Sequence, residues 1–111
     1  MGLDISFTER RNVICPHCGE IVKTEDVRTD YSGGRSWYPI LEYLGYYVPY
    51  EQRTEETDWY GKDMVLTEEQ TKEVYRQIKM NIFEFYRAEQ VMSLIAQASM
   101  NGSLVVINAD W

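Results

Sequence analysis

Residues 12–27, NVICPHCGEIVKTEDV, hold the most informative pattern in this chain. Two β-branched residues lead into a turn that begins at Cys15, and the strand-like run Ile21–Thr24 leads out of it. A proline stiffens the turn, and Gly19 is free to adopt a positive φ. The segment therefore predicts a β-hairpin that carries both cysteines of the chain at its tip.

The turn offers two thiolates, Cys15 and Cys18, separated by two residues. Thiolates at this spacing can hold one tetrahedral Zn²⁺ from a single turn, with backbone N–H groups aimed at sulfur. Residues 13–20 resemble the knuckle of zinc ribbons and rubredoxin-like sites, and the resemblance implies zinc bound by Cys15 and Cys18. Those families supply a second cysteine pair, whereas this chain has only two cysteines.

Two further ligands must complete the shell around such an ion. His17 lies between the two thiolates, and we expect its side chain to point away from the ion. Four carboxylates of the chain are candidates: Asp4, Glu20, Asp26 and Asp110. The more economical arrangement is a homodimer in which each copy gives its cysteine pair to one shared zinc, which resembles the zinc hook.

Two alternatives stand beside zinc. The tetrapeptide Cys-Pro-His-Cys is similar to that of the DsbA-type oxidoreductases, which implies Cys15 as nucleophile and Cys18 as resolving thiol. In those enzymes the first cysteine lies at a helix N-terminus, whose dipole lowers its pKa, whereas the residues after Gly19 are typical of a strand. The second alternative is a relict knuckle that holds no metal.

The segments around the hairpin predict a mixed fold. Alternating apolar residues predict a strand at residues 3–7, followed by a polar turn at 9–12 and, after the hairpin, a flexible loop at 31–35. Ser36 is placed to cap a short helix that ends near Leu44, and Gly45 is a natural stop. Residues 46–66 show no sustained period and predict a long loop.

The second half of the chain predicts helices and a final strand. Residues 67–70 match a capping box, and an apolar stripe at residues 74, 78, 82 and 85 follows it. A second stripe at residues 91–98 ends at an Asn-Gly pair, and Leu104–Ile107 reads as a buried strand that can pair with the N-terminal one. We predict one α+β domain over residues 1–111, in which a small antiparallel sheet with an N-terminal β-hairpin knuckle packs against two to three helices.

Composition excludes several classes of function. The 111 residues carry a net charge of −7, and residues 51–73 hold eight acids against three bases. This charge repels phosphate backbones and disfavours nucleic-acid binding, whereas it suits a basic protein partner. The sequence has no apolar run of the ~20 residues that a membrane helix needs and no signal-peptide core at its start. We expect a cytoplasmic protein whose two cysteines are not a secreted disulfide framework.

Eight of the fifteen aromatic residues fall within residues 37–60. Such side chains give large contact areas at low entropic cost, so the stretch is a candidate surface for a protein partner. The candidate contact residues are Trp37, Tyr46, Tyr47, Tyr50, Trp59 and Tyr60. Arg35 and Arg53 could add stacking or salt contacts to that surface. The alternative is that Trp37, Leu41 and Leu44 face the core and the tyrosines hold a long loop against the domain.

These features favour a non-enzymatic, zinc-binding interaction or adaptor domain, with dimerisation through a shared zinc as one form of it. One alternative is an acidic inhibitor or nucleic-acid mimic that occupies a basic protein surface with residues 51–73. The other is a thiol–disulfide oxidoreductase that uses the two cysteines. As a whole, the chain is faintly similar to small uncharacterised proteins of phages and prophages.

Overall fold

The fold is built on a long hairpin near the N-terminus, as seen in a computed structural model that describes residues 2–111. Strand β1 (Asp4–Ile14) runs antiparallel to β2 (Ile21–Gly33). Strand β4 (Leu104–Asp110) pairs antiparallel with the other edge of β1. The two-residue strand β3 (Met64–Val65) pairs antiparallel with β4, so the strand order is β2-β1-β4-β3. The predicted α+β class, the hairpin and the pairing of the first and last strands are confirmed.

Both strands of the hairpin are longer than predicted. The expected polar turn at residues 9–12 is wrong, because β1 runs straight through it with the Glu9 side chain turned inward. The expected flexible loop at residues 31–35 is also largely strand. Ser32 in β2 accepts a hydrogen bond from Trp37 Nε1 at 2.9 Å and donates one to the carbonyl oxygen of Tyr86. These contacts hold the end of β2 against the core.

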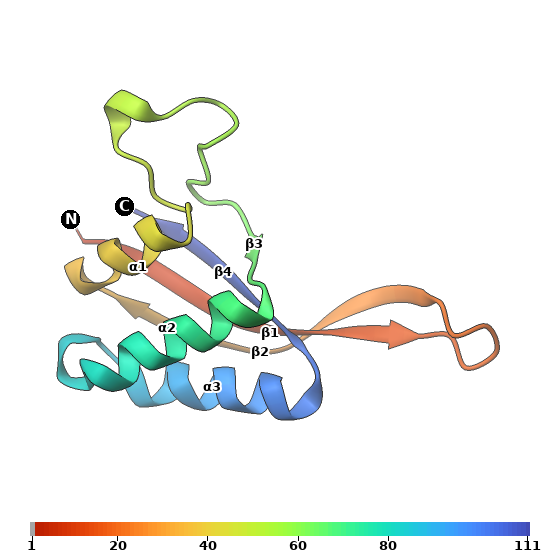
Figure 1. The fold of residues 1–111 in the computed structure, drawn as a ribbon. Coiled ribbons are helices and arrows are strands. Elements are labelled where there is room, and N and C mark those ends of the chain that lie inside the picture. Colours follow the sequence, from red (N-terminus) through yellow and green to blue (C-terminus); the bar gives the residue numbers. More distant parts are fainter. Residues whose placement is uncertain (1) are drawn as a thin grey trace.

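Helices cover one face of the sheet (Figure 1). The three α-helices are α1 (Tyr38–Tyr43), α2 (Glu68–Met80) and α3 (Ala88–Asn101). Three short 3-10 turns accompany them: η1 (Arg35–Trp37), η2 (Tyr50–Gln52) and η3 (Ile82–Glu84). The predicted cap at Ser36 is wrong, since its Oγ donates to the carbonyl oxygen of Glu84 at 2.6 Å. Ser36 therefore ties η1 to η3.

The N-terminus of α2 is the predicted capping box. Thr67 Oγ1 accepts from the Gln70 N–H at 3.1 Å, and Gln70 Oε1 accepts from the Thr67 N–H at 2.9 Å. The helix ends at Met80, and the chain turns through η3 and through Arg87, which has a φ of 55°. Of the predicted apolar stripe, Val74 and Ile78 therefore lie on α2, while residues 82 and 85 belong to the connection to α3.

Replacing Thr67 with alanine is expected to lower the free energy of unfolding by about 1 kcal/mol, because it removes the acceptor for the Gln70 N–H. Thr71→Ala in the first turn of the same helix is the matched control. Thr71 Oγ1 only bonds back to the Thr67 carbonyl oxygen, so its loss is expected to cost little. Urea denaturation of both variants checks this, and equal losses would contradict it.

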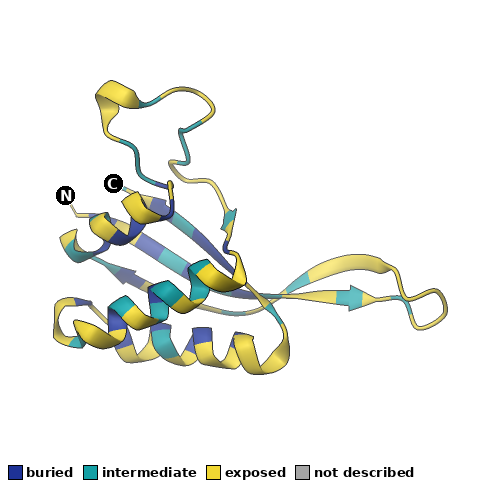
Figure 2. Ribbon diagram, in the orientation of Figure 1, coloured by how far each residue is buried: buried dark blue, intermediate teal, exposed yellow. Residues whose placement is uncertain are grey.

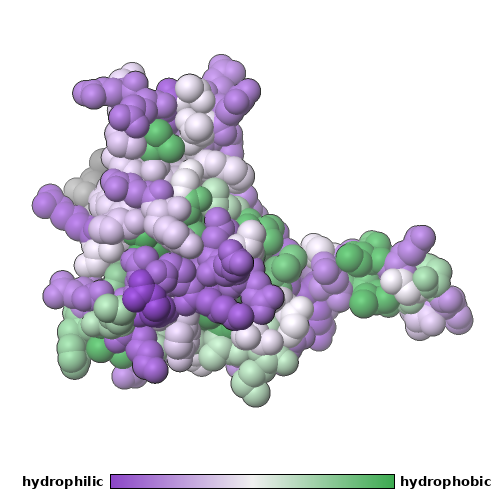
Figure 3. All heavy atoms as spheres, viewed as in Figure 1, coloured by the Kyte–Doolittle hydropathy of each residue, from purple (hydrophilic) through white to green (hydrophobic). Residues whose placement is uncertain are grey.

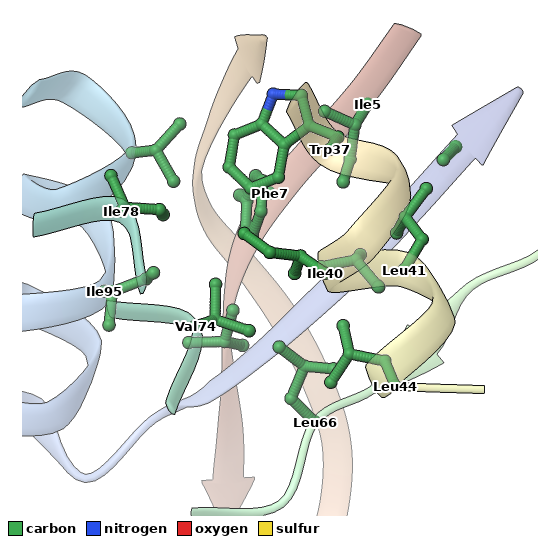
Figure 4. Close-up of a cluster of buried hydrophobic side chains, with 14 of the residues drawn as sticks. Ile5, Phe7, Trp37, Ile40, Leu41, Leu44, Leu66, Val74, Ile78 and Ile95 are labelled. Carbon is green, nitrogen blue, oxygen red and sulfur yellow. The ribbon is translucent and has the colours of Figure 1, made fainter. Parts of the chain in front are cut away.

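The core lies between the helices and the covered face of the sheet (Figure 2). Trp37 is completely buried, and its ring centroid lies 5.2 Å from that of Phe7 and 4.6 Å from that of Phe85. Figure 4 shows apolar side chains of α1, α2, α3 and β1 gathered with Trp37 and Leu66 in one cluster. Ile40 and Leu41 of α1 are buried, and so is Leu44 directly after it, so α1 is held by its apolar side.

One carboxylate of the described residues is buried with this apolar set. Glu9 is 1 % exposed, and its Oε2 accepts hydrogen bonds from Asn101 Nδ2 at 3.0 Å and from Ser103 Oγ at 2.9 Å. Asn101 ends α3 and Ser103 precedes β4. The carboxylate therefore joins the centre of β1 to the turn between α3 and β4.

Candidate metal centre and aromatic surface

The two cysteines lie at the end of a projecting arm, defined here as residues 11–25. Strand β1 pairs with β4 only as far as Arg10, which lies opposite Leu104, and beyond this point β1 and β2 continue as a two-stranded ribbon. Figure 1 shows the ribbon extending away from the helices and the rest of the sheet. Arg11 and Glu25 join its strands with an N–O distance of 2.7 Å.

The tip itself is a tight turn. The Cys15 N–H donates to the Glu20 carbonyl oxygen at 2.8 Å, and the Gly19 N–H donates to the Cys15 carbonyl oxygen at 2.9 Å. Gly19 has a φ of 73°, the conformation for which a glycine is expected here. Both thiols are free, and that of Cys18 is exposed. The turn thus presents two thiols to solvent at the farthest point of the arm.

The backbone of this turn favours the thiolate form of Cys15. Hydrogen bonds to its sulfur from the backbone N–H of His17 and then of Cys18 lower the pKa of Cys15, and the Cys18 thiol adds to the effect. Backbone donors aimed at a thiolate are what a metal-binding knuckle requires, because they stabilise the negative charge on the ligand. No helix begins at Cys15, so the helix-dipole argument for a DsbA-like cysteine has no basis in this turn.

The described part of the chain brings no third candidate ligand to the two cysteines. Among residues 2–111, no three His, Cys, Asp or Glu side chains are grouped so that they could hold a metal ion. Asp4 and Asp110 face each other at the far end of the sheet, about 36 Å of strand away from Cys15. Asp26 lies opposite Arg10, about 16 Å of strand away from Cys15, and pairs with Arg10 at 2.8 Å. The candidate roles of these three carboxylates as ligands are therefore wrong, and only Glu20 stays near the tip.

The predicted partner contacts fall into three groups by burial. Trp37 and Tyr46 are completely buried, so their assignment as contact residues is wrong, and the alternative of a core position holds for Trp37. Tyr47 and Trp59 are partly buried and pack against the core. Tyr50 is 84 % exposed and Tyr60 is about half exposed. Among the six, only Tyr50 is mostly exposed, and Tyr60 exposes about half of its surface.

The half-buried aromatics gather around Trp111. Its ring centroid lies 5.1 Å from that of Tyr47 and 5.0 Å from that of Tyr60, both in edge-to-face geometry. The guanidinium carbon of Arg53 lies 5.3 Å from the Trp111 centroid, and the same group donates two hydrogen bonds to the Val48 carbonyl oxygen. Arg53 thus stacks on rings of its own chain and not on a partner, and it holds the long loop against the domain.

Tyr46 fixes the other end of this loop. Its hydroxyl donates to the Lys62 carbonyl oxygen at 2.6 Å and accepts from the Ala109 N–H at 2.8 Å. Burial raises the pKa of Tyr46 above its ordinary value. Because the native state holds this proton more tightly than the unfolded chain, the stabilising effect is complete below pH 10 and is lost as pH rises further.

Tyr46→Phe is expected to lower the free energy of unfolding at pH 7 by about 1–3 kcal/mol, since the buried Ala109 N–H loses its partner. The variant is also expected to lose less stability than the wild type between pH 9 and pH 11, because it lacks the tyrosine with the raised pKa. Urea titrations across this range check both points. Parallel pH profiles for the two proteins would contradict the second.

A hollow of about 610 Å³ lies on the body of the domain and not at the arm. Leu66, Tyr75 and Ile95 contribute to its lining, between α2, α3 and the start of β4. Glu68 and Lys72 at its edge form an ion pair at 3.3 Å. The two charged residues that line this hollow therefore pair with each other.

Comparison of the chain with protein-family models, with curated proteins and with solved structures found no match. Within residues 2–111, no helix has the length and hydropathy needed to cross a membrane. The case for a function therefore rests on the arm, its cysteines and the charge distribution.

Proposed function

We propose that this chain is a non-enzymatic interaction domain that pairs with a second copy through one shared zinc ion. Cys15 and Cys18 of each copy would supply four thiolates. The observation that carries the proposal is the isolation of the two thiols at the end of the arm, where the described part of the chain offers no set of three ligands. A cysteine pair so far from its own body can meet a second pair without a clash.

The distribution of charge supports pairing through the tips. Residues 11–25 hold two bases and two acids, so the arm is neutral apart from His17 and the net charge of −7 belongs to the rest of the chain. Each arm extends for about 15–20 Å beyond the sheet. Two bodies held apart by both arms are separated by several times the ~8 Å screening length at physiological salt, so their repulsion is weak.

The body is then free to bind a further protein. We propose the loop over residues 46–63 as the contact surface, with Tyr50 and Tyr60 as its exposed aromatic residues. Its acids continue into α2, and residues 51–73 carry a net charge of −5, which suits a basic protein surface. A zinc site made of thiolates also requires reduced cysteines, and we propose a cytoplasmic location for that reason.

Elemental analysis of protein purified without added metal tests the zinc proposal. The expected content is half a zinc per chain, together with the mass of a dimer by native mass spectrometry. A chelator is expected to remove the metal and return the monomer. Metal-free monomers with two freely titrating thiols, even after zinc is added, would overturn the proposal, and turnover in an insulin-reduction assay would support the oxidoreductase alternative instead.

A further inference from the structure

The arm exposes apolar side chains directly beside the cysteine turn. Ile14 is 58 % exposed, Ile21 60 % and Val22 61 %. Figure 3 shows hydrophobic atoms gathered on the arm close to its tip, with polar atoms on either side. Ribbons that project into water seldom carry three such residues together, because each exposes surface that water solvates poorly.

The register of the hairpin brings these residues together. Ile14 pairs with Ile21, whereas Val13 pairs with Lys23, so Val22 is the extra residue of a bulge in β2. A bulge sets two residues of one strand opposite one residue of the other. Ile21 and Val22 therefore lie opposite Ile14, immediately before Cys15 and shortly after Cys18.

We infer that Ile14, Ile21 and Val22 form an apolar contact with the same residues of a second copy, on both sides of the shared ion. The inference rests on the proposed zinc pairing. A zinc ion held by two tips brings the two apolar patches within reach of each other, because the patches adjoin the ligands in sequence. Because residues 11–25 carry no net charge, two such arms meet without electrostatic repulsion.

The size of the patch explains why it needs the ion. Three half-exposed aliphatic side chains offer on the order of 300 Å² per arm, or about 600 Å² for two, against the ~1,200 Å² of a small stable interface. The apolar contact alone is thus too small to hold a dimer. It adds affinity to a dimer that is formed by zinc coordination to the four thiolates. It also removes the exposed side chains from water.

The triple substitution Ile14→Thr, Ile21→Thr and Val22→Thr tests the contact. Threonine keeps the β-branched shape that suits a strand, so the hairpin is retained. Val65→Thr is the matched control, since Val65 is also a strand valine about half exposed, but on β3. Sedimentation equilibrium with one zinc per two chains is expected to show a dimer dissociation constant raised at least tenfold in the triple variant and unchanged in the control.

The possible results separate the contact from the zinc site. A triple variant that dimerises as tightly as the wild type, with half a zinc per chain, would overturn the contact and leave the zinc pairing standing. A wild-type dimer that survives chelation but is lost in the triple variant would support the contact and overturn the shared zinc. A wild-type chain that stays monomeric with zinc would overturn both.

Discussion

Replacement of Glu9 by alanine is expected to lower the free energy of unfolding by about 2–4 kcal/mol. The substitution removes two hydrogen bonds to a charged acceptor, from Asn101 Nδ2 and Ser103 Oγ. Both donors are partly buried, and they lose the Glu9 carboxylate as their acceptor. It also leaves a cavity beneath the sheet. The cost of burying the carboxylate is recovered at the same time, and for this reason the expected loss stays below the sum of these terms.

Glu9→Gln is the informative control, because the amide oxygen can still accept both hydrogen bonds and the volume is unchanged. Its expected loss is less than half that of Glu9→Ala. Urea denaturation with circular dichroism measures both, and α3 is expected to lose amide protection first in the alanine variant, since Asn101 ends that helix. A loss below 1 kcal/mol for Glu9→Ala would contradict the role of this carboxylate as the link between β1 and the α3–β4 turn.

Replacement of both Cys15 and Cys18 by serine is expected to abolish zinc binding and dimer formation completely. A hydroxyl group does not ionise near neutral pH and is a poor zinc ligand, so the double variant has no thiolate to offer. The free energy of unfolding of the monomer is expected to change by less than about 0.5 kcal/mol, because the turn lies on the exposed arm and contributes nothing to the core.

His17→Gln is the matched control for the cysteine variants. It lies in the same turn, and we expect its side chain to point away from the ion, so zinc content and dimer mass should stay at the wild-type values. The single variants Cys15→Ser and Cys18→Ser are each expected to lose tight zinc binding as well. A double variant that still forms a dimer with zinc would show that other residues hold the metal.

The hairpin and the helices were predictable because their signals are local. The two-residue spacing of the cysteines, the β-branched residues beside them and the capping box at Thr67 all act within a few positions. The Glu9 error has a physical reason of the opposite kind. An acid between polar neighbours indicates a turn, and the donors that allow it to be buried lie more than ninety residues away, in Asn101 and Ser103.

The candidate site was predictable only in part, for a similar reason. The pattern Cys-Pro-His-Cys-Gly identifies the turn and its N–H groups, but the length of the arm depends on where β4 stops pairing with β1, at Arg10. Ile14 and Ile21 read in sequence as ordinary strand residues that face a core. Their exposure follows from their position beyond the edge of the sheet, which no spacing in the sequence reports.

The central place of β1 has a consequence for the order in which the protein folds. Its contacts with β2 are local, whereas the pairing with β4 joins positions as far apart as Ser6 and Asn108, which are 102 residues apart in sequence. Closing so long a loop lowers the chain entropy before the contacts between the strands can stabilise the chain. Such pairing is therefore slow. We expect the hairpin and the helical pair to form first and β4 to dock last. Until then one edge of β1 is open to other chains, and refolding yield should fall as protein concentration rises.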